Sequence, residues 1–184
     1  PELLTICRAR GAALMVDDAH GTGTLGARGR GITEHFSLID DHPDILVATS
    51  SKALGVEGGA VATSAPVAAL LRQKARTFVY STSSTPATCA AVSAAIGVLE
   101  GDGSPVPALH RNIRRLASQL GMSEWASPII PVPIGDEAQA VNASAALREA
   151  GYFVPAIRWP TVPRGAAMLR VTVMATHTDE QIDG

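Results

Sequence analysis

Aromatic residues are scarce in this chain of 184 residues: Phe, Trp and Tyr make up 4% of it, although hydrophobic residues make up 46%. A core must therefore be built from Ala, Val, Leu and Ile, which are abundant enough for a globular protein. The net charge is only −2, and no basic stripe is present, so binding to nucleic acid has no electrostatic support. No apolar run approaches the roughly 20 residues of a membrane-spanning helix, so we expect no membrane span.

Cysteine is also rare. Cys7 and Cys89 lie far apart and form no CxxC pattern, so we expect two reduced thiols and neither a disulfide nor a metal site. Such cysteine usage is typical of a cytoplasmic protein. The sequence begins at Pro1, without an initiator Met and without the basic and apolar regions of a signal peptide. We therefore expect that the natural N-terminus is missing.

Strand and helix patterns alternate through residues 1–100, which is typical of an α/β fold. Short, continuous apolar runs indicate strands buried on both faces. These runs occupy residues 12–16, 44–49 and 59–63, and helical patterns occupy residues 3–10, 66–77 and 86–100.

The stretch Gly101–Pro105 is rich in Gly and Pro, which makes it the best linker candidate. Beyond it, the pattern predicts a mixed α+β domain, with a final helix that is cut off at Gly184. Its helices are expected at 107–120 and 137–150, and its strands at 129–134, 152–157 and 168–174. We therefore predict two domains, residues 1–100 and 101–184, the second of them truncated.

A glycine-rich stretch follows the first predicted strand. Gly21–Gly26 matches G-x-G-x-x-G, and Asp40 and Asp41 fall near the acidic position of a dinucleotide-binding site. That site requires the third glycine to lie in an apolar helix packed on the sheet. Here Gly26 is followed by residues rich in Gly and Arg. The context therefore argues against a dinucleotide site.

Polar side chains follow two of the predicted strands. Asp17 and His20 come at the end of the first, and Thr49 and Lys52 at the end of the second. Ligands collect at the carboxyl ends of strands in open α/β sheets. An acid, an imidazole, a hydroxyl and a lysine together suit pyridoxal 5′-phosphate (PLP), whose chemistry needs a Schiff-base lysine and an acid on the ring nitrogen. Taken singly, the same residues also fit a cap acid, a loop histidine and a surface lysine.

Six stretches sharpen this interpretation. They are Val16–Gly23 (VDDAHGTG), Gly29–Gly31 (GRG), Thr49–Gly55 (TSSKALG), Tyr80–Ser83 (YSTS), Pro128–Val132 (PIIPV) and Arg158–Pro163 (RWPTVP). In this order, over nearly the whole chain, they resemble the α-oxoamine synthase family of PLP enzymes. The resemblance implies PLP fold type I, the aspartate aminotransferase-like fold. This chain would then be the C-terminal part of the large domain plus the small C-terminal domain.

The resemblance also implies roles for the strand-end residues. Lys52 would carry PLP as a Schiff base, and Asp17 would pair with the pyridinium nitrogen. Ala19 would pack against the ring, His20 would hydrogen-bond its phenolic oxygen, and Thr49 would contact the phosphate. Lys52, His20 and Asp17 are thus the expected catalytic residues.

Four further residues gain roles in the same way. Ser81 and Thr82 match a segment that reaches the phosphate of the other subunit, which implies a homodimer with shared active sites. Arg158 matches an arginine that grips the substrate carboxylate, and Thr161 a nearby substrate contact. No metal is implied.

The family condenses an amino acid with an acyl-CoA or acyl-carrier-protein thioester and releases CO₂. The stretch Asp17–Gly23 is most similar to the members that serve biotin synthesis from L-alanine and a pimeloyl thioester. Trp159 departs from the proline common in those members. Members resembling serine palmitoyltransferase, 2-amino-3-ketobutyrate CoA ligase or a natural-product synthase therefore stay open.

Two other hypotheses stay open as well: a non-catalytic paralogue or subunit, and a different fold-type-I PLP enzyme. The joint presence of Lys52, Asp17, His20 and Arg158 argues against the first, and the stretch Arg158–Pro163 against the second. Family members are about twice as long, so we expect this chain alone to bind PLP poorly and to be inactive.

Overall fold

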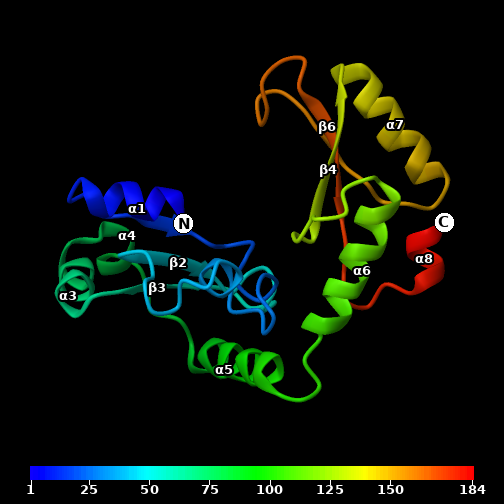
Figure 1. Ribbon diagram of the computed structural model, residues 1–184. Helices are drawn as coiled ribbons and strands as arrows, with labels where there is room; N and C mark the ends of the chain where they lie inside the picture. Colours follow the sequence, from blue (N-terminus) through cyan, green and yellow to red (C-terminus); the bar gives the residue numbers. More distant parts are fainter. The chain divides into compact units, whose positions relative to one another are not determined.

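A computed structural model describes residues 1–184, which divide into two compact units, Pro1–Pro107 and Ala108–Gly184 (Figure 1). The first unit holds a three-stranded sheet of order β1-β2-β3, in which β1 and β2 are parallel and β3 is antiparallel to β2. Its elements are α1 (Glu2–Ala9), β1 (Met15–Asp17), α2 (Ile32–His35), β2 (Ile45–Thr49), β3 (Gly59–Thr63), α3 (Ala65–Lys74), α4 (Arg76–Val79) and α5 (Pro86–Glu100).

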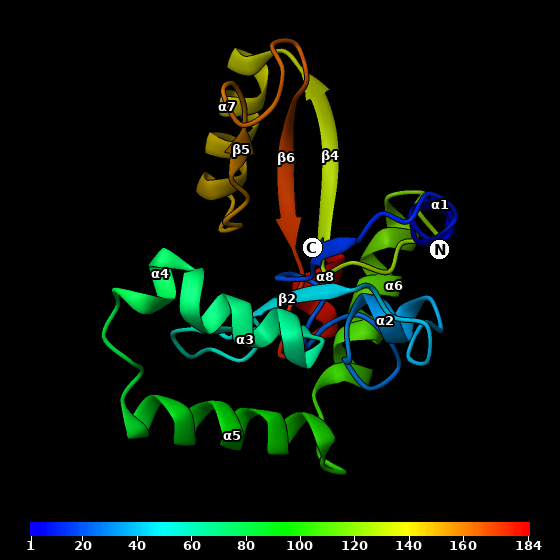
Figure 2. The ribbon, with the colours of Figure 1, turned by 90° about the vertical axis from the view of Figure 1, so that its left-hand side faces the viewer.

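The second unit is an antiparallel sheet of order β4-β6-β5 with helices beside it. Its elements are α6, which begins just before the unit boundary (Val106–Gln119), β4 (Ile129–Gly135), α7 (Glu137–Glu149), β5 (Ala156–Ile157), β6 (Ala167–Thr172) and α8 (Asp179–Asp183). Figure 2 shows α7 running alongside the strands. None of the helices in either unit is long and apolar enough to cross a membrane.

Side-chain caps set the starts of three helices. Thr85 accepts a hydrogen bond from the Thr88 amide (3.2 Å) and precedes Pro86, so α5 begins with a capped and pre-organised first turn. Asp136 caps α7 in the same way through the Gln139 amide (2.8 Å). Thr178 and Gln181 exchange hydrogen bonds at the start of α8, which is a capping box.

The second unit has a well-formed core. Side chains from α6, β4 and the end of β6 make up the buried cluster of Leu109, Ile113, Ala117, Ile130 and Val173. Asn112 is fully buried, and its amide donates to the carbonyls of Met174 (2.9 Å) and His177 (3.0 Å). These bonds fix the turn between β6 and α8, because an unpaired buried amide would cost about 1–3 kcal/mol.

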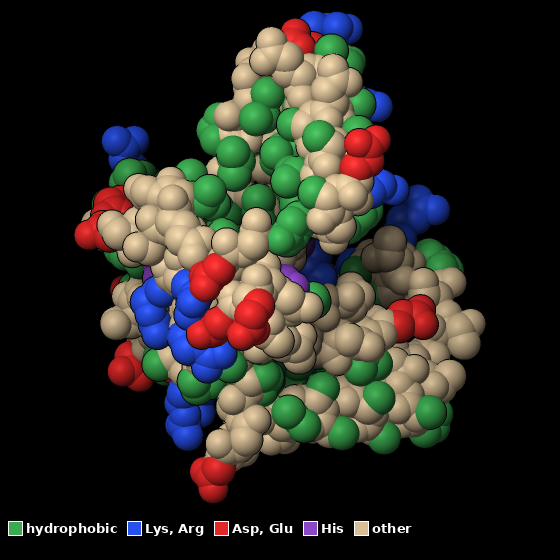
Figure 3. Space-filling model, turned by 90° about the vertical axis from the view of Figure 1, so that its right-hand side faces the viewer, with side chains coloured by type: hydrophobic (Ala, Val, Ile, Leu, Met, Phe, Trp, Pro, Cys, Tyr) green, Lys and Arg blue, Asp and Glu red, His purple; other side chains and the backbone are tan.

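The first unit buries far less. Only Leu4 and Val106 among its hydrophobic side chains are buried, and Met15 on β1 is 64% exposed. Hydrophobic side chains are also exposed on the surface of α5, at the lower right of Figure 3. The expectation that the strands β1, β2 and β3 are buried on both faces is therefore not met within this unit. Four of the five residues of β3 are exposed, β2 is half-buried, and Met15 on β1 is open.

Most predicted elements are present. β3 and α5 have the predicted bounds, whereas β1 and β5 are shorter than predicted. The predicted helix 66–77 is broken at Ala75, whose ψ of 104° is extended, so α3 and α4 are separate. The short helix α2 lies after the glycine-rich stretch and was not predicted.

The glycine-rich stretch itself is a turn. Gly26 has a φ of +81°, outside the helical region, so it does not open the helix that a dinucleotide site requires. Cys7 and Cys89 are free thiols, as predicted.

Candidate active site

The pairing of β1 with β2 brings two groups of polar residues to one edge of the sheet. The strands are parallel, with Asp17 opposite Val47, so their carboxyl ends lie at the same edge. Asp17 is the last residue of β1, Thr49 is the last of β2, and Lys52 follows three residues later. In Figure 1 the loops that follow both strands gather at this end of the sheet.

The loop after β1 presents Asp17, Ala19 and His20. Asp17 is exposed, and one of its carboxylate oxygens accepts a hydrogen bond from the Ala19 amide (3.0 Å). The His20 carbonyl accepts from the Thr24 hydroxyl (2.6 Å), which holds the backbone of the turn. Asp17 thus has a defined orientation and keeps acceptor capacity for a ligand.

The loop after β2 presents Thr49 and Lys52. The Thr49 hydroxyl donates to the Gly58 carbonyl (3.1 Å) and lies 2.8 Å from the Ser51 hydroxyl. Lys52 is exposed, and its carbonyl accepts from the Gly55 amide (3.0 Å). The turn is closed further by the Val56 amide, which donates to the Ser50 carbonyl (2.8 Å). Lys52 therefore stands at the tip of a hydrogen-bonded turn.

A cavity of about 280 Å³ opens in the same unit, between α5, the glycine-rich stretch and the ends of β2 and β3. Among the predicted site residues, only Thr49 lines it. Its wall on α5 consists of Val92, Ile96 and Leu99, together with Glu100. Arg28, Arg30 and Ser50 also line it. The cavity thus combines an apolar wall on α5 with side chains that can bind an anion.

Ser81 and Thr82 lie elsewhere in the first unit. Both are exposed, in the segment between α4 and α5, and the Ser81 hydroxyl donates to the Thr77 carbonyl (2.5 Å). No hydrogen bond links either side chain to the strand-end residues. Within one chain, Ser81 and Thr82 are thus not bonded to Asp17 or Lys52.

Arg158 and Thr161 belong to the second unit. They lie after β5 in a turn closed by the Thr161 amide, which donates to the Arg158 carbonyl (3.0 Å), and both are exposed. The neighbouring Trp159 is 53% exposed, and the Arg164 guanidinium lies over its ring at 5.0 Å. The cation–π contact gives this turn a fixed aromatic surface beside Arg158.

Comparisons with known proteins decide the family. The sequence model of aminotransferase class I and II matches residues 1–184. The chain belongs to the aminotransferase class I and II family. Within that family, the 8-amino-7-oxononanoate synthase of Pseudomonas putida is 47% identical over 188 residues, covering 99% of this chain and 48% of the relative. The biotin biosynthesis bifunctional protein BioWF of Corynebacterium kroppenstedtii is 46% identical, covering 100% and 29%.

Solved structures are similar to this chain as well. Serine palmitoyltransferase of Sphingomonas wittichii has a TM-score of 0.88 at 35% identity, covering 99% of this chain and 47% of that one. 8-Amino-7-oxononanoate synthase of Francisella tularensis has a TM-score of 0.80 at 27% identity, covering 98% and 55%. Fold type I and the resemblance to the α-oxoamine synthases are thereby confirmed. The chain spans about half the length of most of these relatives.

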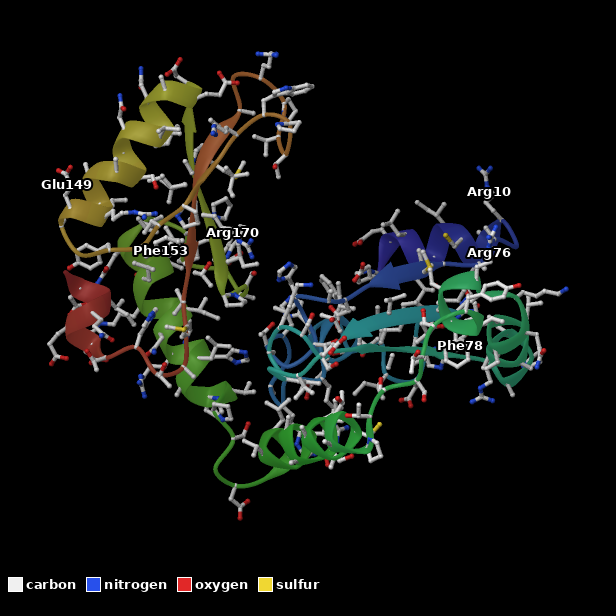
Figure 4. All side chains as sticks on the ribbon, turned by 180° about the vertical axis from the view of Figure 1, so that it is seen from behind. Arg10, Arg76, Phe78, Glu149, Phe153 and Arg170 are labelled. Carbon is white, nitrogen blue, oxygen red and sulfur yellow. The ribbon has the colours of Figure 1, made fainter.

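Two residues of note were missed by the sequence reasoning. Asp18 is 4% exposed and bonds to the loop that carries His20. The sequence offers no periodic signal for it, because Asp18 follows β1 and its partners Thr22 and Ile32 belong to the glycine-rich loop. Arg170 is half-buried on β6, next to the buried Leu169, and its side chain faces away from α7 (Figure 4). Strand alternation through β6 predicts that placement, because Ala167 and Leu169 face the other way.

Proposed function

We propose that this chain is the C-terminal half of a PLP-dependent enzyme that condenses an amino acid with an acyl thioester and releases CO₂. The proposal is carried by the parallel pairing of β1 and β2, which sets Asp17 and Lys52 at one edge of the sheet. A structure of SPT that contains a PLP internal aldimine has a TM-score of 0.89 to this chain at 31% identity. That similarity supports PLP as the cofactor here.

The strand-end residues fit PLP chemically. Asp17 offers an oriented carboxylate for a protonated ring nitrogen. The Thr49 hydroxyl donates to the Gly58 carbonyl in this chain, so it would have to turn from that carbonyl to donate to the phosphate. Ala19 is small enough to lie against a ring face, and His20 would hydrogen-bond the phenolic oxygen. When bound, PLP supplies an electron sink that stabilises negative charge at the substrate Cα.

The residues of the chain then have distinct tasks. The amine of Lys52 holds the cofactor covalently and, once the substrate has replaced it, moves the proton at the substrate Cα. The Asp17 carboxylate keeps the ring nitrogen protonated. Arg158 binds the substrate carboxylate with its planar fork, and Thr161 contacts the substrate beside it. Arg170 is a second candidate for this carboxylate, since none of the ion pairs of the chain involves it.

The specific reaction we propose is that of 8-amino-7-oxononanoate synthase, which joins L-alanine to a pimeloyl thioester. It is supported by 44–47% identity to enzymes of that name over the whole chain. A serine palmitoyltransferase-like reaction is the second candidate, because the TM-score to that enzyme (0.88) exceeds the score to an 8-amino-7-oxononanoate synthase (0.80). We further propose a cytoplasmic homodimer in which Ser81 and Thr82 reach the phosphate of the partner subunit.

The substrate assignment predicts a preference among amino acids. The full-length enzyme with PLP and a pimeloyl thioester should release thiol and CO₂ with L-alanine at least about tenfold more efficiently than with L-serine or glycine, in kcat/KM. Thiol release is followed with a colorimetric reagent, and the product by mass spectrometry. A preference for serine with a long-chain thioester would favour the second candidate. No thiol release with any pair would favour a non-catalytic paralogue.

Arg158 can be compared with a matched control on the same turn. Arg158→Lys keeps the charge but loses the bidentate fork, so KM for the amino acid should rise about tenfold or more. Arg164→Lys makes the same chemical change at another position of this turn. KM for the amino acid should then stay within about twofold of the wild type. Equal effects of the two substitutions would remove Arg158 from the carboxylate site and leave Arg170 as its candidate.

A further inference from the structure

We propose that Asp18 is a positioning residue, whose buried carboxylate holds the loop 18–32 and thereby fixes Asp17 and His20 toward the cofactor. The inference rests on the proposed function, since the cofactor is what Asp17 and His20 would contact. It concerns a residue that touches neither substrate nor PLP and acts through its two neighbours.

The contacts of Asp18 tie together both ends of the loop. One carboxylate oxygen accepts hydrogen bonds from the Ile32 amide (3.0 Å) and the Thr22 hydroxyl (3.2 Å). The backbone of Asp18 is held as well: its amide donates to the Val47 carbonyl (2.8 Å), and its carbonyl accepts from the amides of Gly21 (3.1 Å) and Thr22 (2.9 Å). The residue thus joins β2, the start of the loop and the start of α2.

Two glycines show how closely the loop wraps this carboxylate. A Cβ on Gly21 would lie 1.9 Å from Oδ1 of Asp18, and a Cβ on Gly31 would lie 1.9 Å from Oδ2. Gly31 also has a φ of +81°, which disfavours any other residue there. The backbone therefore approaches both oxygens as closely as it does only because these positions lack side chains.

A second carboxylate closes the outer part of the same loop. Glu34 accepts hydrogen bonds from the amides of Arg28 (3.0 Å) and Arg30 (3.0 Å). The chain from Gly21 to Gly31 is thus organised around two carboxylates, of which Asp18 alone is buried and adjacent to the proposed site.

The link from Asp18 to the cofactor residues is geometric. Asp17 and Asp18 are successive residues at a strand end, so anchoring Asp18 inward turns Asp17 outward. His20 lies inside the turn that the Asp18 carbonyl closes. Burial raises the pKa of Asp18, and the Ile32 amide and Thr22 hydroxyl lower it in return. The net effect is a pKa above the ordinary value for an aspartate. A buried carboxyl group held by such bonds suits a role in alignment, where a misplacement of about 1 Å can cost a hundredfold in rate.

The test compares two aspartates whose side chains accept from backbone amides: Asp18, next to the end of β1, binds the Ile32 amide, and Asp44 binds the Leu14 amide just before β1. Asp18→Asn weakens the anchor at the site, while Asp44→Asn weakens the bond to the Leu14 amide (2.9 Å) at the far end. In the full-length enzyme, Asp18→Asn should shift the pH midpoint of the visible absorbance of bound PLP by about half a unit or more, and should lower kcat about 10- to 100-fold. Asp44→Asn should leave the pH midpoint equal to that of the wild type within error, and kcat within about twofold of the wild type.

The outcomes separate this inference from the proposed function. A wild-type enzyme without PLP absorbance refutes the proposed function before any variant is made. A wild type with PLP, combined with an Asp18→Asn enzyme whose midpoint and kcat match it, overturns the inference alone, even if that variant unfolds in less urea. If Asp18→Asn does not fold, Thr22→Val decides, because it removes one of the two side-chain bonds: a smaller shift in the same direction supports the inference, and no shift overturns it.

Discussion

Replacing Lys52 with Ala should lower kcat about 1,000-fold or more and should remove the visible absorbance of covalently bound PLP. The size follows from the two tasks of one amine, covalent attachment and proton transfer at Cα, of which proton transfer alone contributes about 10²–10⁴-fold. Stopped-flow kinetics and an absorbance spectrum of the purified full-length variant measure both quantities.

A matched control comes from the chain itself. It contains only two lysines, and Lys74 lies at the end of α3, outside the candidate site. Lys74→Ala should keep the wild-type spectrum and a kcat within about twofold. If Lys52→Ala retained a tenth of the activity, or if both variants lost PLP equally, the role of Lys52 would have to be abandoned.

The second large effect is expected at Asp17. Asp17→Asn keeps the shape of the side chain and removes its charge, so the ring nitrogen loses the partner that keeps it protonated. The loss of a hydrogen bond between charged groups, about 1.5–3 kcal/mol, corresponds to roughly a 10- to 100-fold lower kcat. The PLP content should fall less than the rate, because the link to Lys52 remains; both are measured on the same preparation.

Asp40→Asn serves as the comparison for Asp17. Asp40 is an exposed acid in the same unit, and it would matter only if the glycine-rich stretch bound a dinucleotide. We expect Asp40→Asn to leave kcat unchanged. A loss at Asp40 that equalled the loss at Asp17 would contradict the assignment of the acid.

The sequence predicted which sheet edge carries the polar residues better than it predicted the elements around that edge. The polar ends of two apolar runs pointed to one sheet edge, and the parallel pairing of β1 and β2 places Asp17 and Thr49 there. The prediction succeeds at this edge because the carboxyl ends of parallel strands lie at the same edge of a sheet. The roles of these residues came from the resemblance, since an acid and a lysine at a sheet edge also fit ordinary surface positions.

The elements that the sequence did not predict depend on tertiary contacts. The break at Ala75 between α3 and α4 carries no Gly or Pro signal, so the pattern reads as one helix. The two-residue β5 depends on pairing with β6 rather than on its own apolar run. Asp18 was overlooked because its partners, Thr22 and the Ile32 amide, are set by the fold of a glycine-rich loop, which has no periodicity to analyse.

Borohydride reduction followed by peptide mapping tests the central claim most directly. The full-length enzyme is loaded with PLP, reduced, and digested, and the pyridoxyl group is located by mass spectrometry. The account predicts the label on the peptide that contains Lys52, with Lys74 unmodified. A label on Lys74, on a lysine outside this chain, or on no lysine at all would contradict it.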